Sequence, residues 1–166
     1  MKKLLLSILL LLPLFGFAQK GMQGVGVHLG SGYDFDYGTN ASSIEVCYQR
    51  DFSNKFRLSY SLFYLDYPFE WTNYDSDSYY YGNSYFVGID GHYFLNDVRR
   101  LRPYIIGGIH MGSYEIDYSG TTIGLKLGVG LNYRIGYRWS AQMEIPLYLV
   151  EPVGCFIPTF GIAYNF

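Results

Sequence analysis

The feature that most constrains the fold of this 166-residue chain is an alternation of large apolar residues with small or polar ones. In TIGLKLGVGLNYR, residues 122–134, every second residue from Ile123 to Tyr133 is apolar, and Gly, Lys or Asn lie between. Successive side chains of a β-strand point to opposite faces, so this pattern predicts a strand with one apolar face. Eight segments largely alternate in this way: 23–33, 43–52, 56–67, 84–95, 103–114, 121–134, 138–149 and 156–166.

The connectors between these segments alternate in length. They are tight at 51–55, 96–100 and 134–137, and longer and richer in Asp, Tyr and Gly at 34–41, 70–83, 114–120 and 150–155. Short turns on one side and longer loops on the other are typical of an up-and-down transmembrane barrel. We therefore predict an all-β fold, an eight-stranded antiparallel up-and-down transmembrane β-barrel over residues 19–166.

The amino-acid composition indicates which face of the strands contacts lipid and which contacts the interior of the barrel. Only 16% of the residues are charged, whereas a typical soluble domain has about 25%, and there are 20 Gly. In the alternative, a soluble lipocalin-like barrel with an apolar interior, the Gly-rich face would be exposed to water. Gly weakens a strand unless a close approach requires it, and a narrow lumen does. We expect the apolar face to meet lipid, while the fifth segment is apolar on both faces and its register stays open.

The first 18 residues have the pattern of an export signal. Lys2 and Lys3 precede an apolar run that ends at Leu14, and Gly16-Phe17-Ala18 is similar to a small-residue cleavage site. The run is shorter than the about 20 residues of a transmembrane helix. We therefore predict a cleaved signal peptide over residues 1–18.

The last segment ends the chain on an aromatic residue, with apolar side chains at every second position: Phe160, Ile162, Tyr164 and Phe166. Together with the eight segments, this ending resembles the small eight-stranded outer-membrane β-barrels of the OmpX and OmpA membrane-domain type. The resemblance implies an integral, multi-pass protein of the cell outer membrane, surrounded by outer-membrane lipids. It also implies that these four residues form a C-terminal assembly signal, read by the outer-membrane barrel assembly machinery. We expect a monomer.

Charges separate along the predicted barrel. The longer loops carry acidic residues without Lys or Arg, and the opposite side carries a basic rim: Arg50, Lys55, Arg57, Arg99, Arg100, Arg102, Arg134 and Arg138. Such a rim is suited to the anionic phospholipids of a membrane surface. The formal charge is −2, and −4 without Lys2 and Lys3, so no general attraction to nucleic acid is expected.

Four charged residues remain between the rims, all on the Gly-rich inward face: Glu45, Asp90, Lys126 and Glu144. A lone ion in a dry lumen is very costly, so we expect an interior charge network in which Lys126 contacts at least one carboxylate. His28, His92, water or a protonated acid would offset the excess of carboxylates. An eight-stranded lumen is just wide enough for its own side chains, which favours a structural plug over a gate in a conduction path.

The segment 67–86, YPFEWTNYDSDSYYYGNSYF, is rich in aromatic and acidic residues. We expect it to extend two strands above the membrane as a hairpin. Tyr-rich surfaces bind partners well because their rings are large, amphipathic and stiff. The candidate residues for binding an unknown extracellular ligand are Glu70, Trp71, Tyr74, Asp75, Asp77, Tyr79, Tyr80 and Tyr81, and a merely solvated loop is the alternative.

The sequence HMGSYE offers the residue types of a hydrolase triad in His110, Ser113 and Glu115. A nucleophile and its base must lie within hydrogen-bond reach, whereas strand residues three apart point to opposite faces. We therefore expect no catalytic residues, and a lipid A-modifying hydrolase is a distant alternative. The histidines show no metal-ligand spacing, so neither a metal nor a cofactor is predicted.

The two cysteines, Cys47 and Cys155, leave their pairing open. Export would permit a disulfide, and isolated small residues in two strands would serve equally well. As the function, we expect a structural or surface-binding role, adhesion or partner capture, through acidic, Tyr-rich external loops. A narrow solute pore is the alternative.

Overall fold

The computed structural model describes residues 21–166 except 36–37, 39, 74–75, 97–99, 116–118 and 151–152. The predicted signal peptide, residues 1–18, lies outside this part. The described strands are β1 (Gln23–Asp34), β2 (Asn40–Asp51), β3 (Phe56–Asn73), β4 (Ser76–Phe94), β5 (Leu101–Glu115), β6 (Ser119–Arg134), β7 (Trp139–Val150), β8 (Val153–Phe156) and β9 (Thr159–Asn165). No helix among the described residues is long and apolar enough to cross a membrane.

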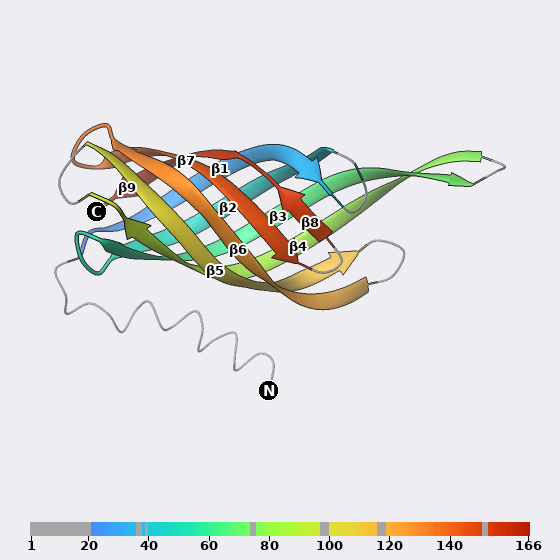
Figure 1. Cartoon of the computed structure of the whole chain (residues 1–166), viewed down its shortest axis with the longest axis horizontal. Coiled ribbons are helices and arrows are strands. Elements are labelled where there is room, and N and C mark those ends of the chain that lie inside the picture. Colours follow the sequence, from blue (N-terminus) through green and yellow to red (C-terminus); the bar gives the residue numbers. More distant parts are fainter. Residues whose placement is uncertain are drawn as a thin grey trace.

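The eighth strand of the barrel is made of two pieces, β8 and β9. Both pair with β7 on one side and with β1 on the other, and residues 157–158 interrupt them. Pro158 stands at this interruption, where a strand tolerates a residue without an N–H. The β1–β9 ladder joins the first strand to the last and closes the sheet (Figure 1). The predicted closed, antiparallel, eight-stranded barrel is confirmed.

The apolar face of each strand points outward. In β6 every second residue from Ile123 to Tyr133 is at least 41% exposed, while Lys126 and Asn132 between them are buried. The lipocalin-like alternative, with an apolar interior and a Gly-rich exterior, is therefore wrong. An apolar surface of this extent in a single chain marks contact with lipid or with another protein.

Strand β5, whose register the sequence left open, presents Ile105, Ile109 and Met111 outward and buries Tyr104 and Ile106. The inward pair packs with Phe94 of β4 in a small apolar cluster. The inward face of β5 is partly apolar because Tyr104 and Ile106 meet Phe94 there.

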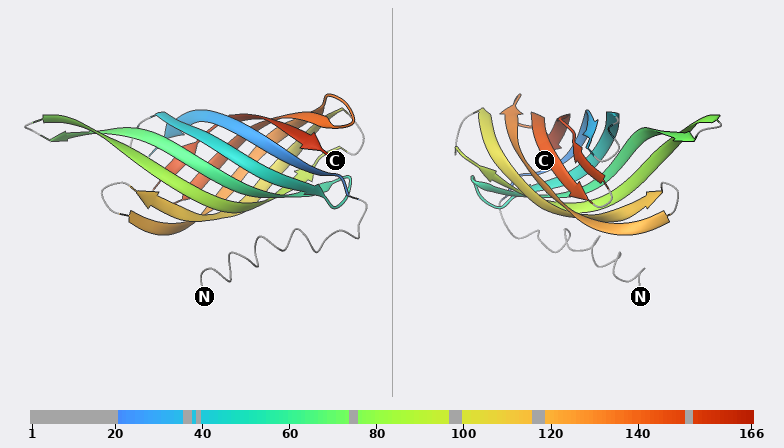
Figure 2. Two further views of the ribbon diagram at one scale, coloured as in Figure 1. Left: turned by 180° about the vertical axis from the view of Figure 1, so that it is seen from behind. Right: turned by 45° about the vertical axis from the view of Figure 1, so that its right-hand side comes forward.

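The two ends of the barrel differ. One end, here called the turn end, carries the short β2–β3, β4–β5 and β6–β7 connections together with residues 21–22 and 166. At the other, the hairpin end, the β3–β4 ladder continues from Phe56↔Tyr93 to Asn73↔Ser76. The resulting hairpin projects well past the neighbouring strands (Figures 1 and 2).

Candidate functional site

The centre of the lumen holds an ion network around Lys126. Its Nζ lies 3.2 Å from Glu45 Oε2, 3.2 Å from Asp90 Oδ2 and 3.3 Å from Glu144 Oε2. These side chains come from β6, β2, β4 and β7, and all four are buried. The structure thus brings together the four inward charges that were singled out from the sequence, because one cation on a long stem reaches carboxylates from three other strands.

Each of the three carboxylates has a second neighbour on its other oxygen. His28 Nδ1 lies 3.6 Å from Glu45 Oε1, His110 Nε2 lies 2.8 Å from Asp90 Oδ1, and the Tyr104 hydroxyl donates to Glu144 Oε1 at 2.8 Å. Sequence reasoning named His28 as a compensating group but missed the roles of His110 and Tyr104. The sequence contains no signal for their inward position, because this segment is apolar on both faces and its register stayed open.

His92, the other compensating group suggested by the sequence, has a different role. Its ring stacks on Tyr104 with centroids 4.9 Å apart and planes 5° apart. Neither ring nitrogen has a hydrogen-bond partner among the described residues. His92 therefore fills the layer next to the ion network instead of joining a carboxylate.

A second charged group lies near the turn end, around Asp51. Arg57 Nε lies 2.6 Å from Asp51 Oδ1, and Arg102 and Arg134 approach Oδ2 at 3.8 and 4.0 Å. The guanidinium groups of Arg57 and Arg102 also lie over the ring of Phe94, at 5.1 and 3.7 Å from its centroid. Such cation–π contacts stabilise a cation most where water is excluded.

This arrangement corrects the predicted basic rim. Arg57 and Arg102 are each only 2% exposed, and Arg50 is also buried, whereas Lys55, Arg100 and Arg138 are exposed. Arg99 lies outside the described residues. The prediction was wrong for Arg57 and Arg102 because inward-facing positions near a strand end still lie inside the barrel, where these two side chains contact Asp51 and Phe94.

A polar chain connects the two charged groups. Gln49 and Gln142 donate to each other's Oε1 at 2.9 and 2.8 Å. His28 Nε2 lies 2.7 Å from Gln142 Oε1, and Arg57 donates to Gln49 Oε1 at 2.8 Å. Gln142 also donates to Asn132 at 3.1 Å. Hydrogen-bonded side chains therefore extend from the Lys126 network to Asp51.

An apolar layer fills the lumen towards the hairpin end. Phe63 and Tyr148 stack there at 4.8 Å with planes 13° apart, and the Tyr148 ring lies 5.6 Å from Lys126 Nζ. The buried members of this layer are Ala41, Phe63, Leu65, Phe86, Tyr148, Cys155 and Ile157. Among the described residues, side chains thus occupy the lumen from the Asp51 group through the Lys126 network to this layer.

Inward glycines make room for the largest polar rings. In the strand pairing, Gly161 is the direct partner of His28, Gly88 of His110 and Gly130 of Tyr104. A Cβ at Gly88 would lie 2.5 Å from atoms of the facing histidine ring, closer than real Cβ contacts. At these three positions the missing side chain of glycine therefore leaves the space that the facing ring occupies.

Gly161→Ala is expected to lower the free energy of unfolding by about 1–3 kcal/mol, because overpacking forces neighbours out of place. The new Cβ would overlap the ring of His28, which is held by Gln142. Urea unfolding of the detergent-solubilised protein, followed by tryptophan fluorescence, measures the change. Gly136→Ala is the matched control, since nothing lies within 4 Å of that Cβ. Two variants of equal stability would contradict the packing argument.

The predicted assembly residues lie on the outer face at the end of the chain. Phe160, Ile162 and Phe166 are exposed, and the Tyr164 ring packs on Trp139 at 5.0 Å. The backbone N–H of Phe166 donates to the carbonyl of Gln23 at 2.8 Å, so the last residue still joins β1.

Six of the eight predicted external binding residues belong to the β3–β4 hairpin as the structure describes it. Tyr74 and Asp75 lie outside the described residues. The backbones of Glu70, Trp71, Asp77, Tyr79, Tyr80 and Tyr81 form part of the ladder, in which Glu70 pairs with Tyr79 and Trp71 with Ser78. Their side chains are outside the described set.

The residues of the hydrolase motif do not converge. His110 is buried against Asp90, while Ser113, three residues on, is exposed on the outer face of β5. The side chain of Glu115 is not among those described. Cys47 and Cys155 are both buried free thiols, which settles the pairing that the sequence left open.

No protein-family model matches the sequence, and no curated protein matches it. Solved structures do share its fold. Neisserial surface protein A is 14% identical over 89% of this chain and 98% of its own, with a TM-score of 0.64. Ail, the attachment invasion locus protein of Yersinia pestis, crystallised with the heparin analogue sucrose octasulfate, is 14% identical over 89% of this chain and all of its own, with a TM-score of 0.58. The outer-membrane enzyme PagL is 16% identical over 85% of this chain and 98% of its own, with a TM-score of 0.50.

At these identities the likeness establishes the fold alone. The chain has the fold of the small eight-stranded outer-membrane β-barrels, as the resemblance predicted.

Proposed function

We propose that this protein is an integral outer-membrane barrel with a filled lumen, which acts at the cell surface as a structural or binding protein. The observation that carries the proposal is the packing of the interior. Two ion groups, a polar chain and an apolar layer occupy the space that a transport protein would leave for its solute. Among the described residues, the outer face carries an apolar belt, and the β3–β4 ladder continues past the neighbouring strands.

The apolar belt and the fold support an outer-membrane location, in contact with outer-membrane lipids. The outward aromatic residues at the end of β9 support recognition by the barrel assembly machinery during insertion. With the hairpin end outside, the exposed Lys55, Arg100 and Arg138 of the turn end would meet the phospholipid of the inner leaflet.

The hairpin is the best candidate for a binding surface. It carries six of the eight residues named above on a continuous two-stranded ladder, which is a stiffer support than an open loop. In the backbone register Glu70 is the cross-strand partner of Tyr79, so the ladder brings acidic and tyrosine positions of the two strands level with each other. Acidic residues without a basic one favour a neutral or cationic partner over a polyanion.

Shortening the hairpin tests this role. Residues 68–81 are removed and the Tyr67–Gly82 pair is closed with an Asn-Gly turn, which suits a two-residue hairpin connection. Cells producing this variant should lose the adhesion to arrayed glycans and proteins that wild-type cells show. A variant of full length with Tyr79, Tyr80 and Tyr81 replaced by serine should lose most of it. Equal adhesion by all three would contradict a binding role and leave the structural one.

The narrow pore is tested by conductance. We expect no stable single-channel steps from the wild-type protein in planar bilayers, because Lys126, Phe63 and Tyr148 fill the middle of the lumen. The Phe63→Ala variant should not conduct either. The substitution removes a ring from the apolar layer, but the Lys126 network next to this layer still fills the lumen. Steps of constant size from the wild type would overturn the filled-lumen proposal and favour the pore.

A lipid A hydrolase gains no support from the described geometry, although PagL shows that enzymes exist on this fold. His110 and Ser113 lie on opposite faces of β5. Deacylation of lipid A by the wild type, abolished by Ser113→Ala, would revive this alternative.

A further inference from the structure

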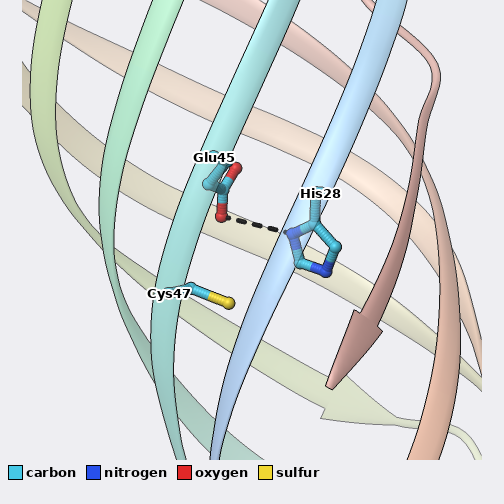
Figure 3. Close-up of side chains that lie close together, drawn as sticks. All are labelled: His28, Glu45 and Cys47. Atoms are coloured by element: carbon cyan, nitrogen blue, oxygen red, sulfur yellow. Dashed lines mark ion pairs between the residues drawn. The ribbon is translucent and has the colours of Figure 1, made fainter. Parts of the chain in front are cut away.

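One cluster inside the barrel has the composition of a metal site. His28 of β1 and Glu45 and Cys47 of β2 offer a nitrogen, an oxygen and a sulfur atom that all lie within 4.8 Å of one another (Figure 3). We propose that these residues bind a divalent metal ion of borderline softness, with Zn²⁺ as the type. The sequence does not reveal the site, because His28 lies on another strand than Glu45 and Cys47 and the three residues have no diagnostic spacing.

The strand pairing places the three ligands together. His28 and Glu45 are direct partners across the β1–β2 ladder, and Cys47, two residues further along β2, points to the same face. The partner of Cys47 is Gly26, where a Cβ would lie only 3.0 Å from the thiol sulfur and 3.3 Å from Ala163. Small residues therefore border the sulfur on the side of β1.

His28 supplies the independent observation that points to a ligand. The residue is 1% exposed, and its Nδ1 has no hydrogen-bond partner among the described residues. Its Nε2 lies 2.7 Å from Gln142 Oε1, an acceptor, so this nitrogen carries the proton. In a neutral ring with its proton on Nε2, the lone pair of Nδ1 points towards Glu45. Histidines that bind metals donate their other ring N–H to an oxygen in this way.

The distance between the facing atoms suits an ion between them. Nδ1 lies 3.6 Å from Glu45 Oε1, which is too long for a hydrogen bond. Two ligand atoms at about 2.0–2.1 Å from a tetrahedral Zn²⁺ lie about 3.3 Å apart. Lys126 holds the other oxygen, Oε2, and so leaves Oε1 directed at the site.

The local charge also favours a cation. The central network opposes three carboxylates, Glu45, Asp90 and Glu144, with the single ammonium of Lys126. The buried arginines nearest to it, at the turn end, face Asp51. A divalent ion at Glu45 would offset the excess negative charge, and the mixed N, O and S ligands select Zn²⁺-like ions over Ca²⁺ and Mg²⁺.

Cobalt is the probe, because Co²⁺ takes tetrahedral sites and reports a bound thiolate by a charge-transfer band. The full chain is refolded from urea into detergent with one equivalent of Co²⁺, and folding is followed by mobility of the unheated protein on gels. We expect the wild type to retain one Co²⁺ per chain after gel filtration and to show the band. Cys155→Ser, which removes the other buried cysteine, should behave like the wild type.

Cys47→Ser should lose the band and bind Co²⁺ at least about tenfold more weakly. The site would be overturned if the folded wild type retained no Co²⁺ after gel filtration, or if Cys47→Ser showed the wild-type band. Loss of the band in Cys155→Ser would also overturn it. If Cys47→Ser does not refold, His28→Gln decides, because it retains a polar side chain facing Gln142. His28→Gln should also bind Co²⁺ at least about tenfold more weakly. Unchanged Co²⁺ retention by this variant would overturn the proposal.

Discussion

Lys126→Ala should lower the free energy of unfolding by about 3–5 kcal/mol, the range for removing one partner of a buried ion pair. The substitution leaves Glu45, Asp90 and Glu144 close together with no ammonium among them, and each is at most 2% exposed. The cost comes from buried charge that is left uncompensated. Urea unfolding in detergent, analysed at equilibrium, measures it.

A neutral replacement of the whole network separates charge from packing. Lys126→Met combined with Glu45→Gln, Asp90→Asn and Glu144→Gln keeps similar volumes and removes every charge. Replacing a complete buried ion group in this way is often neutral or stabilising, so most of the loss should be recovered. Lys55→Ala, at an exposed residue of the β2–β3 turn, should change stability by no more than about 0.5 kcal/mol. A Lys126→Ala variant as stable as Lys55→Ala would refute the network.

Asp51→Ala is the second large effect, a loss of about 3 kcal/mol. Arg57 and Arg102, both buried, would lose the Asp51 carboxylate, whose oxygens lie 2.6 and 3.8 Å from them. Their stacking on Phe94 would then hold two cations together without the charge of Asp51. The same unfolding assay measures the loss.

Two comparisons make this result specific to the arginines. Adding Arg57→Met to Asp51→Ala should restore part of the stability, because it removes one of the two cations that Asp51 faces. Asp66→Ala, at a half-buried carboxylate near the hairpin end, should cost less than about 1 kcal/mol. If Asp51→Ala and Asp66→Ala prove equally mild, the Asp51 group does not stabilise the turn end.

The fold could be predicted because period-2 alternation decides, residue by residue, which side chains face inward. The alternation in β6 and β7 thus assigns Lys126 and Glu144 to the lumen from the sequence alone. Their mutual distances could not be predicted in the same way. The stagger of the strands around the barrel decides which residue of β2 lies level with Lys126 of β6. The alternation of apolar and polar residues gives no information about this stagger.

The same limit explains the other differences. The pairing of His28 with Glu45 depends on the β1–β2 register, which a long connector leaves undetermined. The burial of Arg57 and Arg102 depends on Phe94, a residue of another strand that offers them a ring. The break in the last strand coincides with Pro158, a residue whose missing N–H favours an interruption of the ladder.

The glycines that lie beneath His28, His110 and Tyr104 constrain how this protein can evolve. A larger side chain at one member of a glycine–ring pair requires a smaller one at the other member. The two positions of each pair should therefore change together during evolution. In descendants of this chain, the ring and the glycine of a pair could exchange positions across the two strands. The barrel would be kept even where the rest of the sequence diverges beyond recognition.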